Sequence, residues 1–125
     1  MAQYSLMVAP NGARRGRGDH PQLPVTNTQV AQTAAACFAA GAQALHLHVR
    51  DAQGRHSLDA GGYRAAIDAV RELAPGMAVQ ITTESAGIYD TAAQVACLEA
   101  LRPAAASVSV RELARDVRQA ARAYA

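Results

Sequence analysis

The sequence predicts an α/β fold, namely the first four β/α units of a (β/α)8 barrel of the TIM type. Strand and helix patterns alternate four times along the chain, which is typical of parallel strands joined by crossover helices. One face of each expected strand is apolar, whereas the other is small at the start and polar at the carboxyl end. An open doubly wound sheet would be apolar on both faces, so this asymmetry favours a barrel with its active site at the strand ends.

The first unit begins with a strand over residues 4–9, which a Pro-Asn-Gly turn ends. Residues 12–25 form a polar loop, and a loop of this length in a small domain is usually functional. A helix then begins at Thr26, where Gln29 completes a capping box, and it ends at Gly41. Its apolar stripe consists of Val30, Ala34, Cys37 and Phe38.

The second unit pairs the strand of residues 45–51 with a helix over 60–73, after a turn at Gln53 and Gly54. Tyr63, Ile67 and Val70 share one face of that helix.

The third unit consists of a strand over residues 78–83 and a helix over 91–101 that stops before a proline. The fourth has a strand over 105–110 and a last helix that reaches the final residue. Its helical register is set by Leu113, Val117 and Ala121.

Two histidines in the second strand are the candidate metal ligands. His46 and His48 project from one face of the strand because side chains alternate, while Leu45, Leu47 and Val49 cover the other. Imidazole suits zinc, copper, iron or nickel rather than magnesium or calcium. A catalytic zinc usually has three protein ligands, so this pair needs a third. The alternative is two ordinary histidines that take part only in packing.

Three polar residues on the same face are candidate substrate contacts. Thr82 and Ser107 offer neutral hydroxyl donors that suit a carboxylate, although such hydroxyls also satisfy nearby backbone groups. Glu84 adds a carboxylate that we expect to line the polar cavity.

Arginines flank these candidates. Arg14 lies on the first loop, where a guanidinium would bind a substrate carboxylate and repel an ammonium group. Exposure to solvent is the alternative for Arg14, and it is what we expect for Arg15. Arg50 and Asp51 are expected to pair and to support the histidines.

Composition excludes several classes of function. A net charge of +2 is too small to indicate nucleic acid or a membrane surface as the partner, and no apolar run is long enough to span a bilayer. The chain contains no lysine, so carbonyl chemistry would need a metal rather than a Schiff base. Cys37 and Cys97 are expected to be buried free thiols, and the protein to be cytoplasmic with small-molecule partners.

Several motifs resemble the β-keto acid cleavage enzymes. They are PNGA after the first strand, LPVT before the first helix, AGAxxxHLHVRDxxGRHSLD, QITT, and LRPxxxS before the fourth strand. The HLHVRD segment is the specific one. The resemblance implies a (β/α) barrel, a zinc ion, and condensation of a β-keto acid with acetyl-CoA to give acetoacetate and a new acyl-CoA.

The resemblance also implies roles for residues. His46 and His48 match the family's histidine ligands, and Thr82 and Ser107 match hydroxyls that hold the substrate's carboxylate. The third ligand, a glutamate, and the catalytic Asp and Arg are expected beyond residue 125.

The sequence departs from the family pattern at two places, in the first loop and after the third strand. Arg14 replaces an acid of the amino-acid-cleaving member, which puts an amine-bearing substrate in doubt. Glu84 and Ser85 replace a common Gly-Gly, which narrows the mouth of the site.

The extent of the chain leaves further alternatives open. Residues 1–125 are expected to be the N-terminal half of a barrel, truncated within its last helix pattern, because a complete barrel has roughly 250 residues. Open sheet edges favour a homo-oligomer. The alternative functions are a metal-dependent hydrolase with an HxH barrel site, and an inactive truncated product that binds only metal or a partner chain. The hydrolases usually carry HxH on the first strand rather than the second.

Overall fold

The computed structural model describes residues 4–123, which form a four-stranded parallel sheet in the order β1-β2-β5-β6. Neighbouring strands in the sheet follow one another along the chain, apart from a small hairpin that lies outside it. The strands are β1 (Met7–Val8), β2 (Ala44–Leu47), β5 (Ala78–Thr82) and β6 (Ala106–Ser107). The prediction of an α/β fold with a parallel sheet is therefore confirmed, whereas closure into a barrel stays a prediction.

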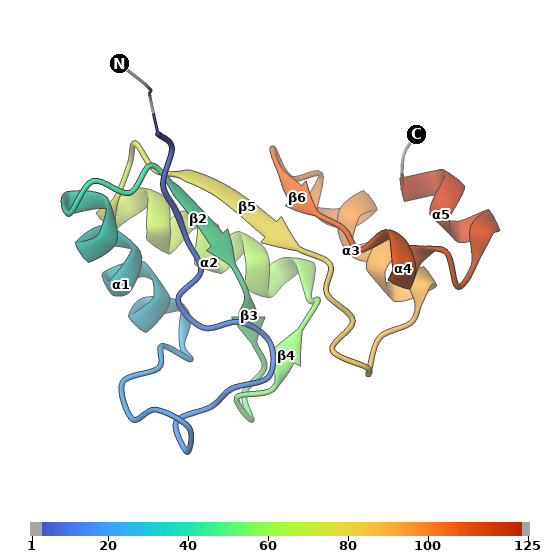
Figure 1. The fold of residues 1–125 in the computed structure, drawn as a ribbon, viewed down its shortest axis with the longest axis horizontal. Helices are drawn as coiled ribbons and strands as arrows, with labels where there is room; N and C mark the ends of the chain where they lie inside the picture. The colour runs from blue at the N-terminus through green and yellow to red at the C-terminus, as the bar shows by residue number, and fades with distance from the viewer. Residues whose placement is uncertain (1–3, 124–125) are drawn as a thin grey trace.

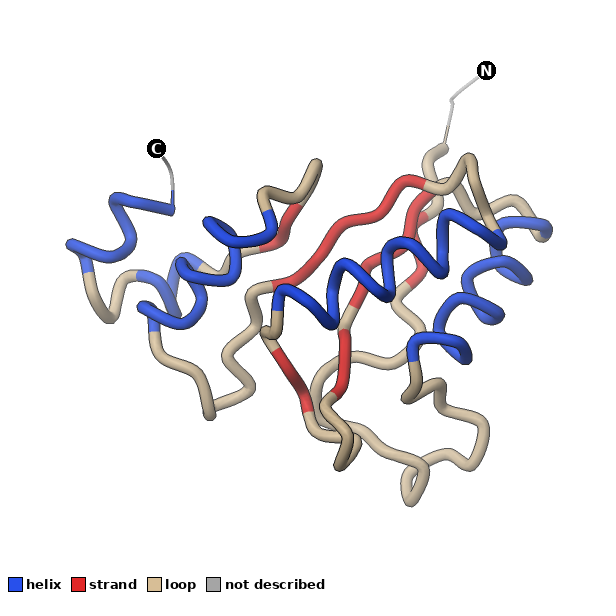
Figure 2. Tube along the Cα trace, turned by 180° about the vertical axis from the view of Figure 1, so that it is seen from behind, coloured by secondary structure: helices blue, strands red, loops and turns tan. Residues whose placement is uncertain are grey.

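Three long helices connect these strands and lie on one side of the sheet (Figures 1 and 2). They are α1 (Asn27–Ala39), α2 (Ala60–Leu73) and α3 (Thr91–Leu101). No helix of residues 4–123 covers the opposite face in either view. None of the described helices has the length and apolar character that crossing a membrane requires.

Side chains capable of capping begin the helices where the sequence places them. The amide of Gln29 donates to the Thr26 hydroxyl at 3.2 Å, and the Gln29 side chain accepts from the Thr26 amide at 3.1 Å, which confirms the capping box. Asp59 and Asp90 cap α2 and α3 in the same way. Gly41 follows α1 with a φ of +106°, a conformation that favours glycine.

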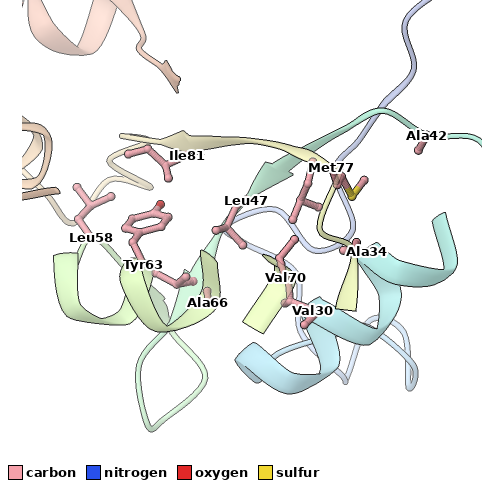
Figure 3. Packing of buried hydrophobic residues seen from close by; sticks show 14 of the residues in the cluster. Val30, Ala34, Ala42, Leu47, Leu58, Tyr63, Ala66, Val70, Met77 and Ile81 are labelled. Carbon is pink, nitrogen blue, oxygen red and sulfur yellow. The ribbon is translucent and has the colours of Figure 1, made fainter. Parts of the chain in front are cut away.

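The hydrophobic core lies between the sheet and its helices (Figure 3). Leu45, Leu47 and Ile81 point from the sheet and are fully buried. Tyr63 of α2 lies among them, and its hydroxyl donates to the carbonyl of Thr82 at 2.8 Å. Burial raises the pKa of the Tyr63 phenol, so the hydroxyl keeps its proton as a donor. Both cysteines are free, with Cys97 buried and Cys37 only half-buried.

The first strand is shorter than predicted. Residues 4–9 were expected to be extended throughout, but only Met7 and Val8 pair with β2. Tyr4 and Leu6 are exposed, because no strand of the described chain lies on the outer edge of β1 to bury them.

The predicted histidine strand is interrupted at His48. β2 ends at Leu47, and β3 (Val49–Arg50) pairs antiparallel with β4 (His56–Ser57) in a separate hairpin. Gly54 provides the positive φ of +77° in the connecting turn. The turn was predicted, but the return strand was not.

The fourth unit also differs from its prediction. The strand expected over residues 105–110 ends at Ser107, because Ser109 caps a short helix, α4 (Val110–Leu113). A second helix, α5 (Val117–Ala123), follows. Only Leu113 of the predicted apolar register is buried, and Val117 and Ala121 are exposed, so the single continuous helix was wrong. Its predicted extension to the last residue lies outside the described residues.

Replacing Leu47 with Ala tests the sheet–helix core. Leu47 is fully buried, so we expect the free energy of unfolding to fall by about 2–5 kcal/mol, through lost burial and the remaining cavity. The matched control is Leu73→Ala, because Leu73 is half exposed at the end of α2 and should cost less than about 1 kcal/mol. Urea denaturation of both variants measures the difference, and equal losses would contradict this description of the core.

Candidate active site at the carboxyl ends of the strands

A polar pocket lies beyond the carboxyl ends of β2, β5 and β6, with a volume of about 330 Å³. It brings together four of the six residues proposed from the sequence, whereas His48 and Arg14 do not line it. The lining residues are His46, Thr82, Glu84, Ser107, Val108, Ser109 and Glu112. This is the end of a parallel sheet at which α/β enzymes bind their substrates.

His46 and His48 lie side by side although β2 ends between them. Their ring centroids are 4.9 Å apart, with an interplanar angle of 66°. The Nδ1 atom of His46 lies 2.7 Å from Oε1 of Gln80, the residue that pairs with it on β5. Because a carbonyl oxygen only accepts, Nδ1 carries the proton and Nε2 keeps a free lone pair. The Gln80 contact therefore orients His46 as an outer-shell partner orients a metal ligand.

His48 is buried and electrically neutral. Only 3% of its surface is exposed, and burial lowers its pKa to about 3, with smaller contributions from His46, His56 and Arg50. Its Nδ1 atom is buried without a hydrogen-bond partner. A neutral imidazole beside a second one with a free nitrogen fits a transition metal.

The histidine pair supplies only part of a metal site. Among residues 4–123, no group of three or more His, Cys, Asp or Glu side chains is placed to hold a metal ion. Glu84 does not complete such a group, and the need for a third ligand stays a prediction.

His56 is a neighbour of the pair that the sequence analysis missed. Its ring centroid lies 5.5 Å from that of His48, and its Nε2 donates to the carbonyl of Glu84 at 2.6 Å. Burial lowers the pKa of His56, which favours the neutral ring. The available signal was the turn at Gly54, because a hairpin there places His56 opposite Arg50.

The two hydroxyls of the pocket contact each other. Ser107 and Thr82 are paired across β5 and β6, and the Ser107 hydroxyl donates to that of Thr82 at 3.1 Å. The backbone amide of Glu84 also donates to the Thr82 hydroxyl, at 3.1 Å. The local backbone role is therefore present for Thr82. Since its oxygen accepts from both groups, its own proton remains available to a substrate oxygen.

Arg14 is not a free cation at the rim, as the sequence analysis assumed. Its Nε lies 3.3 Å from Oε1 of Glu84. The Arg14 side chain is 71% exposed and that of Glu84 is 32% exposed. The pair joins the first loop to the end of β5 at the edge of the pocket.

The predicted pair between Arg50 and Asp51 is wrong. The Arg50 guanidinium donates to the carbonyls of Gly12 at 2.7 Å and Arg15 at 2.9 Å, so it holds the first loop. Asp51 instead accepts from the Arg55 guanidinium at 2.8 Å and from the Arg55 amide at 2.9 Å. The backbone hydrogen bond from Arg55 contributes most to lowering the pKa of Asp51. Each residue stabilises a loop, and neither pairs with the other.

Glu112 is the second residue of the site that the sequence analysis missed. Its carboxylate accepts from the amide and the hydroxyl of Ser85, each at 3.0 Å, and from the Gln94 amide group at 2.7 Å. These bonds fix the loop that follows β5. No motif signalled this role, because its partners Ser85 and Gln94 lie far from residue 112 in the sequence.

Comparison with known proteins identifies the family. Residues 4–123 match the sequence profile of the beta-keto acid cleavage enzyme family, BKACE. A 3-keto-5-aminohexanoate cleavage enzyme of Fusobacterium nucleatum subsp. nucleatum is 33% identical over 104 residues, which are 82% of this chain and 36% of that protein. The 3-oxoadipate:acetyl-CoA acetyltransferase of Cupriavidus necator is 31% identical over 78 residues, which are 62% of this chain and 28% of that protein. The chain thus spans about a third of the length of these curated relatives.

A solved structure shares the fold. A ternary complex of ObcA with a C4-CoA adduct and oxalate superposes with a TM-score of 0.59 at 22% identity, covering 70% of this chain and 23% of that one. The profile match spans every described residue, including the segment that carries both histidines. The chain belongs to the β-keto acid cleavage enzyme family.

Proposed function

We propose that this chain provides the metal- and carboxylate-binding part of a zinc-dependent β-keto acid cleavage enzyme. The reaction condenses a β-keto acid with acetyl-CoA and yields acetoacetate and a new acyl-CoA. The observation that carries the proposal is the pocket at the strand ends, where an imidazole and two hydroxyls meet in a member of this family. The relative named 3-oxoadipate:acetyl-CoA acetyltransferase supports acetyl-CoA as the co-substrate.

His46 and His48 would hold the zinc ion. When bound, zinc acts as a Lewis acid that polarises a ketone and stabilises negative charge that develops beside it. His46 would offer Nε2, because the contact to Gln80 holds the proton of the neutral ring on Nδ1. His48 is already neutral because it is buried, so it need not lose a proton on binding metal.

Thr82 and Ser107 would bind the carboxylate of the β-keto acid. Hydroxyl donors hold an anion without adding a full positive charge, which leaves the metal as the main electrophile. Their mutual hydrogen bond at 3.1 Å keeps the two oxygens close together, and Ser107 would turn its proton from Thr82 to the carboxylate when the substrate binds. The third metal ligand and the groups that move protons would come from later β/α units.

We further propose that the chain forms the first part of a closed (β/α)8 barrel. The two outer strands of its sheet, β1 and β6, each have one unpaired edge within the described chain. Large apolar side chains are exposed at or beside both strands, namely Met7 of β1, Leu6 just before it, and Val108 just after β6. Further strands would cover these groups and remove edges that otherwise favour aggregation.

Arg14 would select the substrate by the group at the end opposite to the carboxylate that Thr82 and Ser107 bind. A guanidinium at the rim of the pocket attracts a second carboxylate and repels an ammonium. One relative is named for 3-oxoadipate, a β-keto acid with two carboxylates, and the other for an amino-substituted keto acid. Arg14 favours the dicarboxylic class for this protein.

Acetoacetate should form from a β-keto acid only when acetyl-CoA is also supplied. The physical reason is that the acetyl group must accept the carbon fragment released from the substrate. We expect removal of zinc by a chelator to abolish the reaction and added zinc to restore it. Chromatographic assay of acetoacetate measures the outcome, and cleavage of the β-keto acid to acetate without acetyl-CoA would contradict a transfer reaction and favour a hydrolase.

Replacing His46 or His48 with Ala should lower zinc affinity by at least about tenfold, since each removes one ligand. Elemental analysis of the purified protein gives the zinc content directly. The matched control is His20→Ala, because His20 is exposed on the first loop and lines a different pocket, which contains neither His46 nor His48. Zinc retained at full stoichiometry in the double variant His46→Ala/His48→Ala would show that the metal lies elsewhere.

Replacing Arg14 with Glu should shift preference toward an amino-substituted β-keto acid. We expect a change of about 1–3 kcal/mol in relative transition-state stabilisation, as for a hydrogen bond to a charged group. The measurement is kcat/KM for 3-oxoadipate and for 3-keto-5-aminohexanoate. Arg17→Glu makes the same charge change at an exposed position of the same loop and should leave the ratio unaltered. If Arg14→Glu also leaves the ratio of the two kcat/KM values unaltered, Arg14 does not select the substrate.

A further inference from the structure

The ion pair between Arg14 and Glu84 joins two separate loops at the rim of the pocket. A single nitrogen of Arg14, Nε, contacts a single oxygen of Glu84 at 3.3 Å. Most of the Arg14 side chain is exposed, and water therefore screens the pair. Such a contact is weak, and a better anion can replace it.

Glu84 is held in place independently of Arg14. Its amide donates to the Thr82 hydroxyl at 3.1 Å, and its carbonyl accepts from His56 at 2.6 Å. The next residue, Ser85, is fixed by two hydrogen bonds to Glu112. The backbone that carries the carboxylate is therefore anchored on both sides, so Glu84 stays at the pocket when Arg14 is released.

The backbone around Arg14 is anchored too. Arg50 holds the carbonyls of Gly12 and Arg15, which lie on either side of Arg14 in the first loop. An exchange of partners at Arg14 therefore needs only a rotation of its exposed side chain. The loop itself keeps its place.

We propose that Glu84 is a specificity-determining residue, an internal carboxylate that occupies Arg14 until the far carboxylate of the substrate replaces it. The exchange is favourable because a free carboxylate can meet a guanidinium through two parallel hydrogen bonds, whereas Glu84 makes one. A substrate with a neutral end gains nothing by opening the pair. A substrate with an ammonium end could pair with Glu84 only by breaking the contact to Arg14. The ammonium would then lie beside the Arg14 cation, which repels it. The inference rests on the proposed function, because it assumes that the pocket accepts a β-keto acid.

Binding of an unreactive dicarboxylate tests this proposal without requiring turnover. Calorimetry at low salt compares adipate, which has carboxylates at both ends, with hexanoate, which has one. We expect Glu84→Gln to tighten adipate binding by about two- to fivefold, the range of an exposed ion pair, and to leave hexanoate unaffected. Arg14→Gln should reduce adipate affinity to that of hexanoate.

Glu84→Asp separates the contact from the charge. The shorter side chain keeps the negative charge but withdraws the carboxylate from a contact that is already 3.3 Å long. We expect Glu84→Asp to tighten adipate binding as well, and to have no effect once Arg14 is Gln. Glu99→Asp is the matched control, because Glu99 pairs with Arg122 outside the pocket and should not alter adipate binding. Thermal unfolding of every variant confirms that it is folded.

Several outcomes would overturn the proposal. If Glu84→Gln tightens adipate binding but Glu84→Asp does not, the negative charge of Glu84 repels adipate, and its contact with Arg14 does not compete with adipate. Unchanged or weaker adipate binding in both Glu84 variants, or no adipate binding at all, would also contradict it. Because the assay contains no acetyl-CoA, a protein that binds adipate as expected but forms no acetoacetate would refute the proposed reaction and leave this inference intact.

Discussion

The register between β2 and β5 is the constraint on which the site depends. His46 pairs with Gln80 and Leu47 with Ile81, so His46 lines the pocket with Gln80 against its ring, and the apolar pair enters the core. Because side chains alternate along a strand, a slip of one residue would bury the polar pair and expose the apolar one. Burial of Leu47 and Ile81 thus fixes the position of His46 without any contact to a ligand. The energy that stabilises the core also places the candidate metal ligand.

The loops around the pocket depend on a different kind of interaction. Arg50, His56 and Glu112 each bind backbone groups of a segment distant in sequence, and they use short hydrogen bonds to do so. An ionised donor such as Arg50 or an ionised acceptor such as Glu112 gives a stronger hydrogen bond than a neutral pair, and together with His56 these residues immobilise loops that have little core of their own. The sheet therefore positions the pocket residues on the strands, whereas these three side chains position the loops around the pocket.

The sequence predicted what periodicity and capping determine. The alternation of strand and helix, the capping box at Thr26 and the polar ends of the strands all follow from local patterns, and the structure contains them. The hairpin that carries His56 was missed because its strands have two residues each, too few for an alternating pattern. The role of Glu112 was missed because its partners, Ser85 and Gln94, are brought near it only by the folded chain.

Ionisable groups in and around the pocket already have partners within the protein or are neutral, which bears on how the pocket would discriminate between anions. Glu112 is satisfied by three donors, His48 is neutral because it is buried, and Glu84 is paired with Arg14. A net positive pocket would attract any carboxylate through its field. A pocket whose charged groups already have partners instead favours a ligand that makes specific hydrogen bonds. Here hydroxyls would offer such bonds at one end, and the guanidinium of Arg14 would offer them at the other. Under the proposed function, selectivity for a substrate with two carboxylates would follow from the geometry of the contacts rather than from net charge.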